Sequence, residues 1–182
     1  MYRNRAQLEE GYLAQAKIEF LFFWGHQPSR DGKITSSCLS QWWPAPFAVD
    51  AVSYPTVEHW MMAEKARLFG DHEIASRILE TESPKQAKQW GREVRGFDAA
   101  RWDDEKFGVV AEGNGHKFGQ NPALREFLLN TGSAVLVEAS PVDNVWGIGL
   151  AADDNRASNP LQWRGDNLLG FALMQVREEL RG

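Results

Sequence analysis

The sequence YPTVEHWMMAEKARLF, residues 54–69, has the spacing of a helix whose apolar stripe includes two opposite charges. We place the start of this helix near Thr56 and advance 100° per residue. The residues predicted on the stripe are Glu58, Met61, Met62, Lys65, Leu68 and Phe69. The residues predicted off the stripe are His59, Ala63, Glu64 and Arg67.

Two interpretations of the charges on this stripe stay open. A buried charge is costly unless it pairs, accepts hydrogen bonds or performs chemistry. Glu58 and Lys65 are seven residues apart, roughly 10 Å along a helix axis. They form either a structural ion pair, whose acid also helps the helix to begin, or part of a functional site.

The composition is that of a globular protein large enough for one domain with a sizeable core. The chain has 182 residues, of which 43% are hydrophobic and 25% charged. Its formal net charge of −5 does not favour broad attraction to nucleic acid or to acidic membranes. A local basic pocket remains compatible with this charge. The eight tryptophans mainly predict core packing, and some of them are candidates for stacking on planar rings.

The single cysteine and the amino-terminal segment restrict the setting of the protein. Cys38 excludes an intrachain disulfide and a multi-cysteine zinc site, and we expect it to pack as a small hydrophobic residue. Residues 1–17 lack the apolar core of a signal peptide, and no segment is long and apolar enough to span a bilayer. We therefore expect a cytoplasmic protein without a membrane partner.

The order of predicted elements indicates an α+β fold: a compact, helix-rich single domain with a small β-sheet. Residues 1–17 form a lead-in, and residues 18–182 form the domain. Strands are predicted within 18–24, which we expect to be buried, within 38–50 and at 134–138. Helices are predicted at 56–69, 71–81, 83–94, 97–118, 121–129 and after a cap at Asp166 or Asn167. Loops are predicted at 25–37 and 140–163.

The sequence contains no glycine-rich nucleotide loop and no recognisable metal motif. The glycines at 113 and 115 do not extend to the dinucleotide-binding pattern, and no phosphate-binding loop is present. The four histidines lack paired ligand spacing, and adjacent Glu58 and His59 point about 100° apart on a helix. We therefore predict neither a metal site nor a cofactor.

Two carboxylates are candidates for acid–base chemistry. Glu58 lies on the apolar face of its helix, and Asp143 lies in the loop PVDNVWG, residues 141–147. Hydrolysis of a glycosidic bond commonly uses two separated carboxylates, one as acid and one as base or nucleophile. The alternative for Asp143 is an Asx turn, which aspartate forms readily in loops.

A third pattern lies on the long predicted helix at 97–118. Its stripe consists of Trp102, Lys106, Val109, Gly113 and Lys117. An aromatic ring one turn from a cation suits a planar base that carries a phosphate. A tryptophan and two lysines at the edge of a core would produce the same spacing.

Seven segments in this order resemble the NADAR family of YbiA-like proteins. The resemblance covers about residues 18–180, nearly the whole chain. The segments are PAPFAVD (44–50), YPTVEHWMMAEKARLF (54–69), SPKQAKQWGREV (83–94), FDAARWDDEK (97–106), KFGQNPALREFLLNTG (117–132), LVEASPVDNVWGIGL (136–150) and NLLGFALMQVREEL (167–180).

The resemblance implies an α+β N-glycosidase that needs no metal. Family members cleave the N-ribosyl bond of ribosylaminopyrimidine phosphates from early riboflavin synthesis, or remove ADP-ribose from guanine bases in nucleic acid. It implies catalytic roles for Glu58, Lys65 and Asp143. The substrate-binding residues that we assign with it are His59, Arg92, Trp102, Lys106, Trp146 and Gly147.

The sequence also departs from the family pattern. Gln41 stands where asparagine is frequent, and Trp60-Met61-Met62 replaces an aromatic–Phe–Gln run. These changes bear on the choice of substrate more than on the reaction type, so both substrate classes stay open. The oligomeric state stays open as well.

The mechanism we expect has Glu58 acting at C1 of the ribose or as general acid and base, with Asp143 supporting it. Lys65 is either a nucleophile that forms a Schiff base or a cation that grips an anion. Attraction to Glu58 would keep Lys65 protonated, whereas burial would favour the neutral amine. A non-catalytic module that binds NAD or ADP-ribose is the alternative function, and a helical interaction scaffold is a further one.

Overall fold

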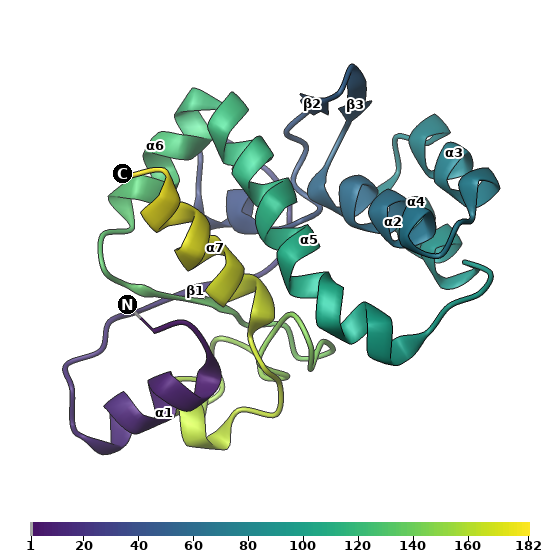
Figure 1. Ribbon diagram of the computed structural model, residues 1–182. Coiled ribbons are helices and arrows are strands. Elements are labelled where there is room, and N and C mark those ends of the chain that lie inside the picture. The colour runs from purple at the N-terminus through teal and green to yellow at the C-terminus, as the bar shows by residue number, and fades with distance from the viewer. Residues whose placement is uncertain (1) are drawn as a thin grey trace. The chain divides into compact units, whose positions relative to one another are not determined.

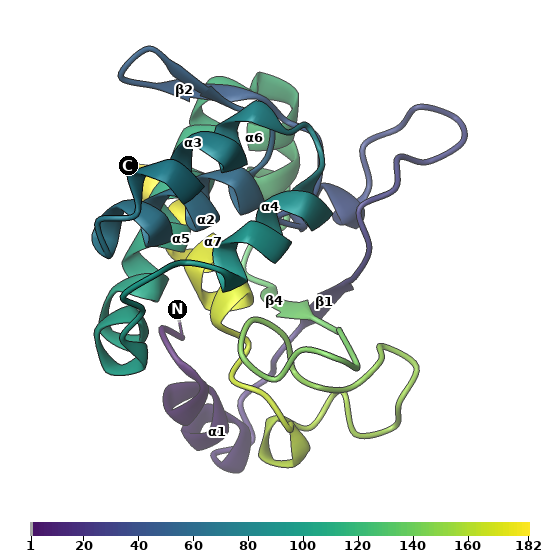
Figure 2. The ribbon, with the colours of Figure 1, turned by 90° about the vertical axis from the view of Figure 1, so that its right-hand side faces the viewer.

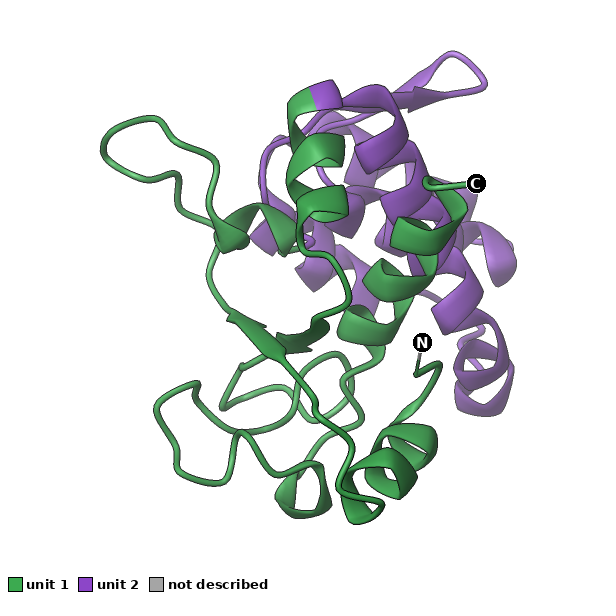
Figure 3. Ribbon diagram, turned by 90° about the vertical axis from the view of Figure 1, so that its left-hand side faces the viewer, with its two compact units in different colours: residues 1–40, 123–182 green, residues 41–122 purple. Residues whose placement is uncertain are grey.

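The computed structural model describes residues 2–182, which form helices and two small sheets, so the predicted α+β class is confirmed (Figure 1). The chain divides into two compact units (Figure 3). One consists of Met1–Ser40 and Ala123–Gly182, called here the first unit, and the other of Gln41–Pro122, called the second unit. The predicted lead-in includes Met1, which lies outside the described residues. No helix within residues 2–182 is long and apolar enough to cross a membrane.

The second unit is built around helix α2. Its elements are β2 (Phe47–Val49), β3 (Val52–Tyr54), α2 (Val57–Leu68), α3 (His72–Glu80), α4 (Pro84–Arg92) and α5 (Ala99–Gln120). Strands β2 and β3 pair antiparallel, with Phe47 opposite Tyr54. Helices α3, α4 and α5 all contact α2. The residues of α2 are therefore enclosed from several sides.

The helices of the second unit begin where polar side chains cap them. Thr56, Asp71, Ser83 and Asp98 each accept a hydrogen bond from a backbone N–H in the first turn of the helix that follows. Such caps satisfy donors that the helix itself leaves unpaired. The predicted starts near 56, 71 and 83 are confirmed, and the long helix begins after Asp98 rather than at residue 97.

Helix α2 is buried around its whole circumference in its first half, and in this respect the predicted stripe is wrong. All residues from Val57 to Ala63 are buried. His59 and Ala63, which were predicted off the stripe, are fully buried, whereas Leu68 and Phe69 are only partly buried. The reason is that α2 packs against three helices rather than one surface.

A glycine of α5 allows this helix to approach Trp60 of α2. A Cβ atom on Gly113 would overlap Cδ1 of Trp60 and lie 2.9 Å from its Nε1. That indole N–H donates a hydrogen bond of 2.8 Å to the carbonyl of Val109, which fixes the ring. The two helices can therefore lie in contact only if residue 113 has no side chain.

We expect Gly113→Ala to lower the free energy of unfolding by about 1–3 kcal/mol, because the rigid indole must move. The matched control is Gly108→Ala in the same helix, where a Cβ atom meets nothing within 4 Å. This control should raise stability by up to about 1 kcal/mol, because alanine favours the helix. Urea unfolding measures both effects, and equal effects of the two substitutions would contradict the packing argument.

The first unit combines a two-stranded parallel sheet with helices. Its elements are α1 (Arg5–Leu13), β1 (Phe20–Phe23), η1 (Ser36–Leu39), α6 (Pro122–Asn130, whose first residue belongs to the second unit), β4 (Val135–Glu138), η2 (Pro160–Gln162) and α7 (Leu168–Glu179). Strands β1 and β4 lie side by side, with Phe20 opposite Val135 (Figure 2). Strand β4 also contacts α7. The strands predicted within 18–24 and 134–138 are thus confirmed.

The first of these strands is less buried than expected. Of the residues of β1 only Phe23 is buried, and the neighbouring Trp24 is 60% exposed. Strand β1 pairs with β4 alone in the described sheet, so it is an edge strand rather than a central one.

Asn167 joins helix α7 to strand β4 through its side chain. It is the N-cap residue of α7 and adopts the left-handed conformation, with φ of 55°, but its side chain does not cap the helix. Instead, Oδ1 accepts from the N–H of Glu138 at 2.9 Å, and Nδ2 donates to the carbonyl of Leu136 at 2.9 Å. The fully buried amide thus pairs with β4 as a neighbouring strand would.

We expect Asn167→Asp to lower the free energy of unfolding by about 1–3 kcal/mol. The substitution keeps the shape but places an oxygen where the carbonyl of Leu136 needs a donor. Asn155→Asp is the control with the same charge change, since Asn155 is exposed. Urea unfolding of both variants gives the comparison, and a similar loss in the control would contradict the role of the buried amide.

Candidate functional site

The residues assigned to the site from sequence occur in both units. Those of the second unit are Glu58, His59, Lys65, Arg92, Trp102 and Lys106. Those of the first unit are Asp143, Trp146 and Gly147.

Glu58 lies in the first turn of α2 and is 2% exposed. Its backbone N–H donates to the carbonyl of Gln41 at 3.1 Å, so this first turn is tied to the segment before β2. A carboxylate is favoured at a helix amino terminus because unpaired N–H groups point toward it. Position and burial therefore hold the Glu58 carboxyl in a fixed setting.

Lys65 lies in α2, seven residues after Glu58. Its ammonium nitrogen lies between two aromatic rings and a backbone carbonyl. The Nζ atom donates a hydrogen bond of 2.8 Å to the carbonyl of Gly91. It lies 4.3 Å from the centre of the Phe97 ring and 5.8 Å from that of Trp102. The aromatic rings and the carbonyl hold the amine in one place while leaving it partly accessible.

The surroundings of Lys65 favour its neutral form. Burial is the larger cause that lowers the pKa of Lys65 below its ordinary value of 10.5, and the positive charge of Arg92 is the second. Within residues 2–182, no ion pair joins Lys65 to Glu58. The structural ion pair considered from sequence is therefore wrong, because Lys65 turns toward α4 and α5 rather than along α2.

The pattern predicted on α5 splits into two parts. Trp102 and Lys106 are partly exposed, and Nζ of Lys106 lies 2.6 Å from Oδ1 of Asp103. Gly113 and Lys117 are buried. The long helix passes into the core, so of the expected pattern only Trp102 and Lys106, in its first part, stay partly exposed.

His59 is fully buried, and this placement does not favour direct contact with a substrate. Its Nδ1 and Oγ1 of Thr56 form a hydrogen bond of 2.8 Å, which helps to fix the start of α2. Burial lowers the pKa of His59 and outweighs a hydrogen bond with the backbone of Thr81. Among residues 2–182, no three His, Cys, Asp or Glu side chains converge in a way that could hold a metal ion.

Asp143 organises the loop that follows β4. Its Oδ1 accepts from the N–H of Val145 at 2.9 Å and from that of Trp146 at 2.8 Å. This is the Asx-type turn considered from sequence. A carboxylate has a second oxygen, so the turn is compatible with a further role of Asp143, and its catalytic role stays a prediction.

The glycines after Trp146 bring this loop against β4. A Cβ atom on Gly147 would lie 2.7 Å from the carbonyl oxygen of Glu138. The neighbouring Ile148 donates its N–H to that carbonyl at 2.9 Å. Gly149 has φ of 67°, a conformation that glycine adopts without strain. Gly147 is thus needed for backbone packing, and its contact with a substrate stays a prediction.

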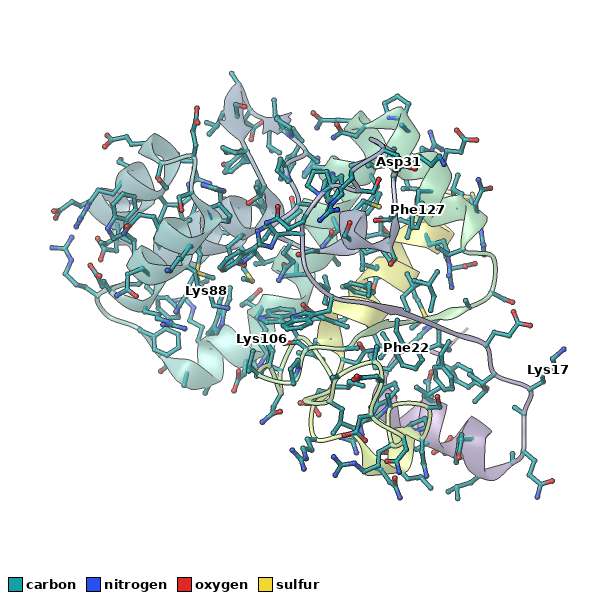
Figure 4. The ribbon with its side chains drawn as sticks, turned by 180° about the vertical axis from the view of Figure 1, so that it is seen from behind. Lys17, Phe22, Asp31, Lys88, Lys106 and Phe127 are labelled. Atoms are coloured by element: carbon teal, nitrogen blue, oxygen red, sulfur yellow. The ribbon has the colours of Figure 1, made fainter. Side chains whose placement is uncertain are left out.

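A cavity on α4 contains mostly residues that were not predicted from sequence to belong to the site. The cavity has a volume of about 530 Å³ and is lined by Trp42, Ser83, Lys85, Gln86, Lys88, Gln89 and Arg92. Only Arg92 had been assigned to the site. The spacing of Lys85, Lys88 and Arg92 on a predicted helix was the available signal, because residues three and four apart share a face. Figure 4 labels Lys88 of this helix and Lys106 of α5.

Comparison with known proteins identifies the class of this protein. Residues 22–181 match the NADAR domain family. N-glycosidase R617 of Acanthamoeba polyphaga mimivirus is 42% identical over 166 residues, which cover 88% of this chain and 96% of that protein. N-glycosidase YbiA of Escherichia coli K12 is 33% identical over 135 residues, covering 74% and 76%.

A solved structure agrees with these matches. The NMR structure of the E. coli protein YbiA superposes with a TM-score of 0.71 at 29% identity, covering 90% of this chain and 85% of that one. The protein is thus an N-glycosidase, a hydrolase of N-glycosyl bonds. More particularly, the chain belongs to the NADAR domain family.

Proposed function

We propose that this N-glycosidase hydrolyses the N-ribosyl bond of a nucleotide-like substrate. The substrate is either a ribosylaminopyrimidine phosphate of riboflavin synthesis or guanine that carries ADP-ribose. The single observation that supports this best is the setting of Lys65: a partly buried amine, held between rings, with a lowered pKa.

The lowered pKa matters because only a neutral amine is a nucleophile. An unperturbed lysine is neutral in only about one molecule in 2,500 at pH 7. Burial and the charge of Arg92 both increase this fraction for Lys65. Attraction to Glu58 was expected to keep Lys65 protonated. Within residues 2–182 the Lys65 ammonium makes no ion pair with Glu58, so this reason for protonation does not apply.

The proposed reaction begins when the lone pair of the Lys65 amine attacks C1 of the ribose. The C1–N bond breaks, and its electron pair stays on the leaving nitrogen, which takes up a proton. The attached nitrogen then loses a proton. The ribose ring opens, its ring oxygen takes up a proton, and an iminium forms between C1 and Lys65. Addition of water then releases the sugar aldehyde and restores the amine.

The carboxylates complete the proposal. Glu58 acts as the general acid and base that moves the protons of these steps, and the fixed setting of its carboxyl suits that task. A supporting role of Asp143 in this reaction stays a prediction from the family resemblance. Trp102 is proposed to stack on the planar leaving group, since its ring already lies near the Lys65 amine.

A product assay with both kinds of substrate tests the proposal. Release of ribose 5-phosphate from a ribosylaminopyrimidine phosphate identifies the first class, and release of ADP-ribose from modified guanine identifies the second. The net charge of −5 favours a small or locally bound substrate over a long duplex. If neither product forms under conditions in which the protein is folded and binds ADP-ribose, the non-catalytic binding module is favoured. The cytoplasmic location stays a prediction that cell fractionation would test.

A further inference from the structure

Three cations line the α4 cavity, and no described acidic residue lines it with them. Among the described residues that line the cavity, Lys85, Lys88 and Arg92 are basic and none is acidic. Elsewhere in this unit, Arg95 pairs with Asp71 at 2.6 Å. None of the three cavity cations forms such a pair within residues 2–182. The cavity therefore carries net positive charge.

The position of these cations along α4 makes the charge unfavourable unless an anion binds. Lys85 and Lys88 are three residues apart, and Lys88 and Arg92 are four apart, so all three lie on one face of the helix. Like charges at these spacings destabilise a helix. A bound anion would reverse this repulsion and would form charge-assisted hydrogen bonds with the same groups.

The remaining residues of the cavity suit a phosphorylated organic molecule rather than a bare ion. Trp42 provides a planar ring, and Nζ of Lys88 lies 5.8 Å from its centre. Ser83, Gln86 and Gln89 add neutral hydrogen-bonding groups. The volume of about 530 Å³ lies within the range of small-molecule sites.

The cavity also adjoins the proposed nucleophile through the backbone of α4. The carbonyl of Gly91 accepts the hydrogen bond from Lys65, and the next residue, Arg92, lines the cavity. Lys65 and the cavity therefore contact neighbouring residues of α4.

We propose that the α4 cavity holds the phosphate of the ribosyl substrate, with Lys85, Lys88 and Arg92 as its binding cations. This inference rests on the proposed function and specifies which residues bind the phosphate or pyrophosphate that both of its substrates bear. Ribose 5-phosphate and ADP-ribose share this chemistry. Lys85 and Lys88 thereby become substrate-binding residues, whereas Lys65 and Glu58 perform the reaction.

Binding measured by calorimetry tests the inference without turnover. Ribose 5-phosphate and ADP-ribose are titrated into the wild-type protein and into Lys88→Gln and Lys85→Gln. Loss of one charge-assisted hydrogen bond should weaken binding about tenfold. Lys33→Gln is the matched control, because its side chain is 80% exposed and does not line the cavity. Circular dichroism confirms that the variants keep their helices.

The results distinguish a site for a single phosphate from a site for a pyrophosphate. They also distinguish failure of this inference from failure of the proposed function. Weaker binding of both ligands supports a site for a single phosphate, and weaker binding of ADP-ribose alone supports a pyrophosphate site. Unchanged binding of both ligands in both cavity variants, or equal weakening in Lys33→Gln, overturns the inference. If the cavity variants bind more weakly but the wild-type protein hydrolyses neither substrate, the inference stands and the proposed function fails. If hydrolysis occurs with an unchanged KM in Lys88→Gln, the proposed function stands and the inference fails.

Discussion

Lys65→Met is expected to lower kcat by at least about 100-fold, because the substitution removes the proposed nucleophile. Methionine fills a similar volume between Phe97 and Trp102, so the fold should persist. The variant loses the hydrogen bond to the carbonyl of Gly91, which is a modest cost for a partly exposed group. Single-turnover kinetics at saturating substrate measure the chemical step directly.

Lys65→Arg distinguishes the two roles considered for this residue. Arginine keeps the positive charge but does not deprotonate in proteins, so it can bind an anion and cannot attack C1. We expect Lys65→Arg to be as inactive as Lys65→Met. Borohydride should reduce the iminium of the wild-type protein to a stable amine, visible by mass spectrometry on the peptide that contains Lys65. Activity of Lys65→Arg within a few-fold of wild type, or no trapped adduct, would contradict the nucleophile.

The pH dependence follows from the direction of the pKa shift. The rate should increase with pH as Lys65 loses its proton and become constant above its pKa. Since burial and Arg92 lower that pKa, the midpoint of kcat/KM should lie below 10.5. Arg92→Gln removes one of the two causes, so its midpoint should move to higher pH, whereas Arg92→Lys should leave the midpoint nearly unchanged. A midpoint that does not respond to Arg92→Gln would argue against Lys65 as the titrating group.

Local signals were sufficient to predict most elements of the fold. Thr56, Asp71 and Ser83 cap helices where the sequence predicts them, because capping depends on a few adjacent residues. The burial of α2 was not predictable in the same way. Periodicity assumes one buried face, and only the packing of α3, α4 and α5 around α2 explains why His59 and Ala63 are buried.

The same distinction applies to the candidate site. The resemblance to a family directed attention to Glu58, Lys65 and Asp143, which lie at fixed places in recognisable segments. It did not reveal which neighbours surround Lys65. Gly91 and Phe97 come from α4 and from the segment before α5, and their approach to the amine depends on tertiary packing. The spacing of the cations of the α4 cavity on one helical face can be predicted from the sequence. Only the three-dimensional structure shows that no described acidic residue lines the cavity with them.

Glu58→Gln is expected to abolish measurable turnover, with a loss of at least about 100-fold in kcat. Glutamine has nearly the same shape and still fits the first turn of α2, where the side chain is 2% exposed. It cannot donate and then recover a proton, so the leaving nitrogen would have to depart as an anion. Through the helix dipole alone, loss of the charge at the helix amino terminus should reduce stability by about 0.3–1 kcal/mol.

Glu64→Gln is the matched control for this prediction, since it removes one carboxylate from the same helix. Glu64 is partly exposed and pairs with Arg67, so its loss should leave kcat within a few-fold of wild type. Binding of ADP-ribose to Glu58→Gln should remain close to wild type, because the carboxyl acts on protons rather than on phosphate. If Glu58→Gln loses binding and thermal stability together with activity, the residue is structural. If activity alone disappears, the first turn of α2 places the acid of the reaction on the same helix as the nucleophile.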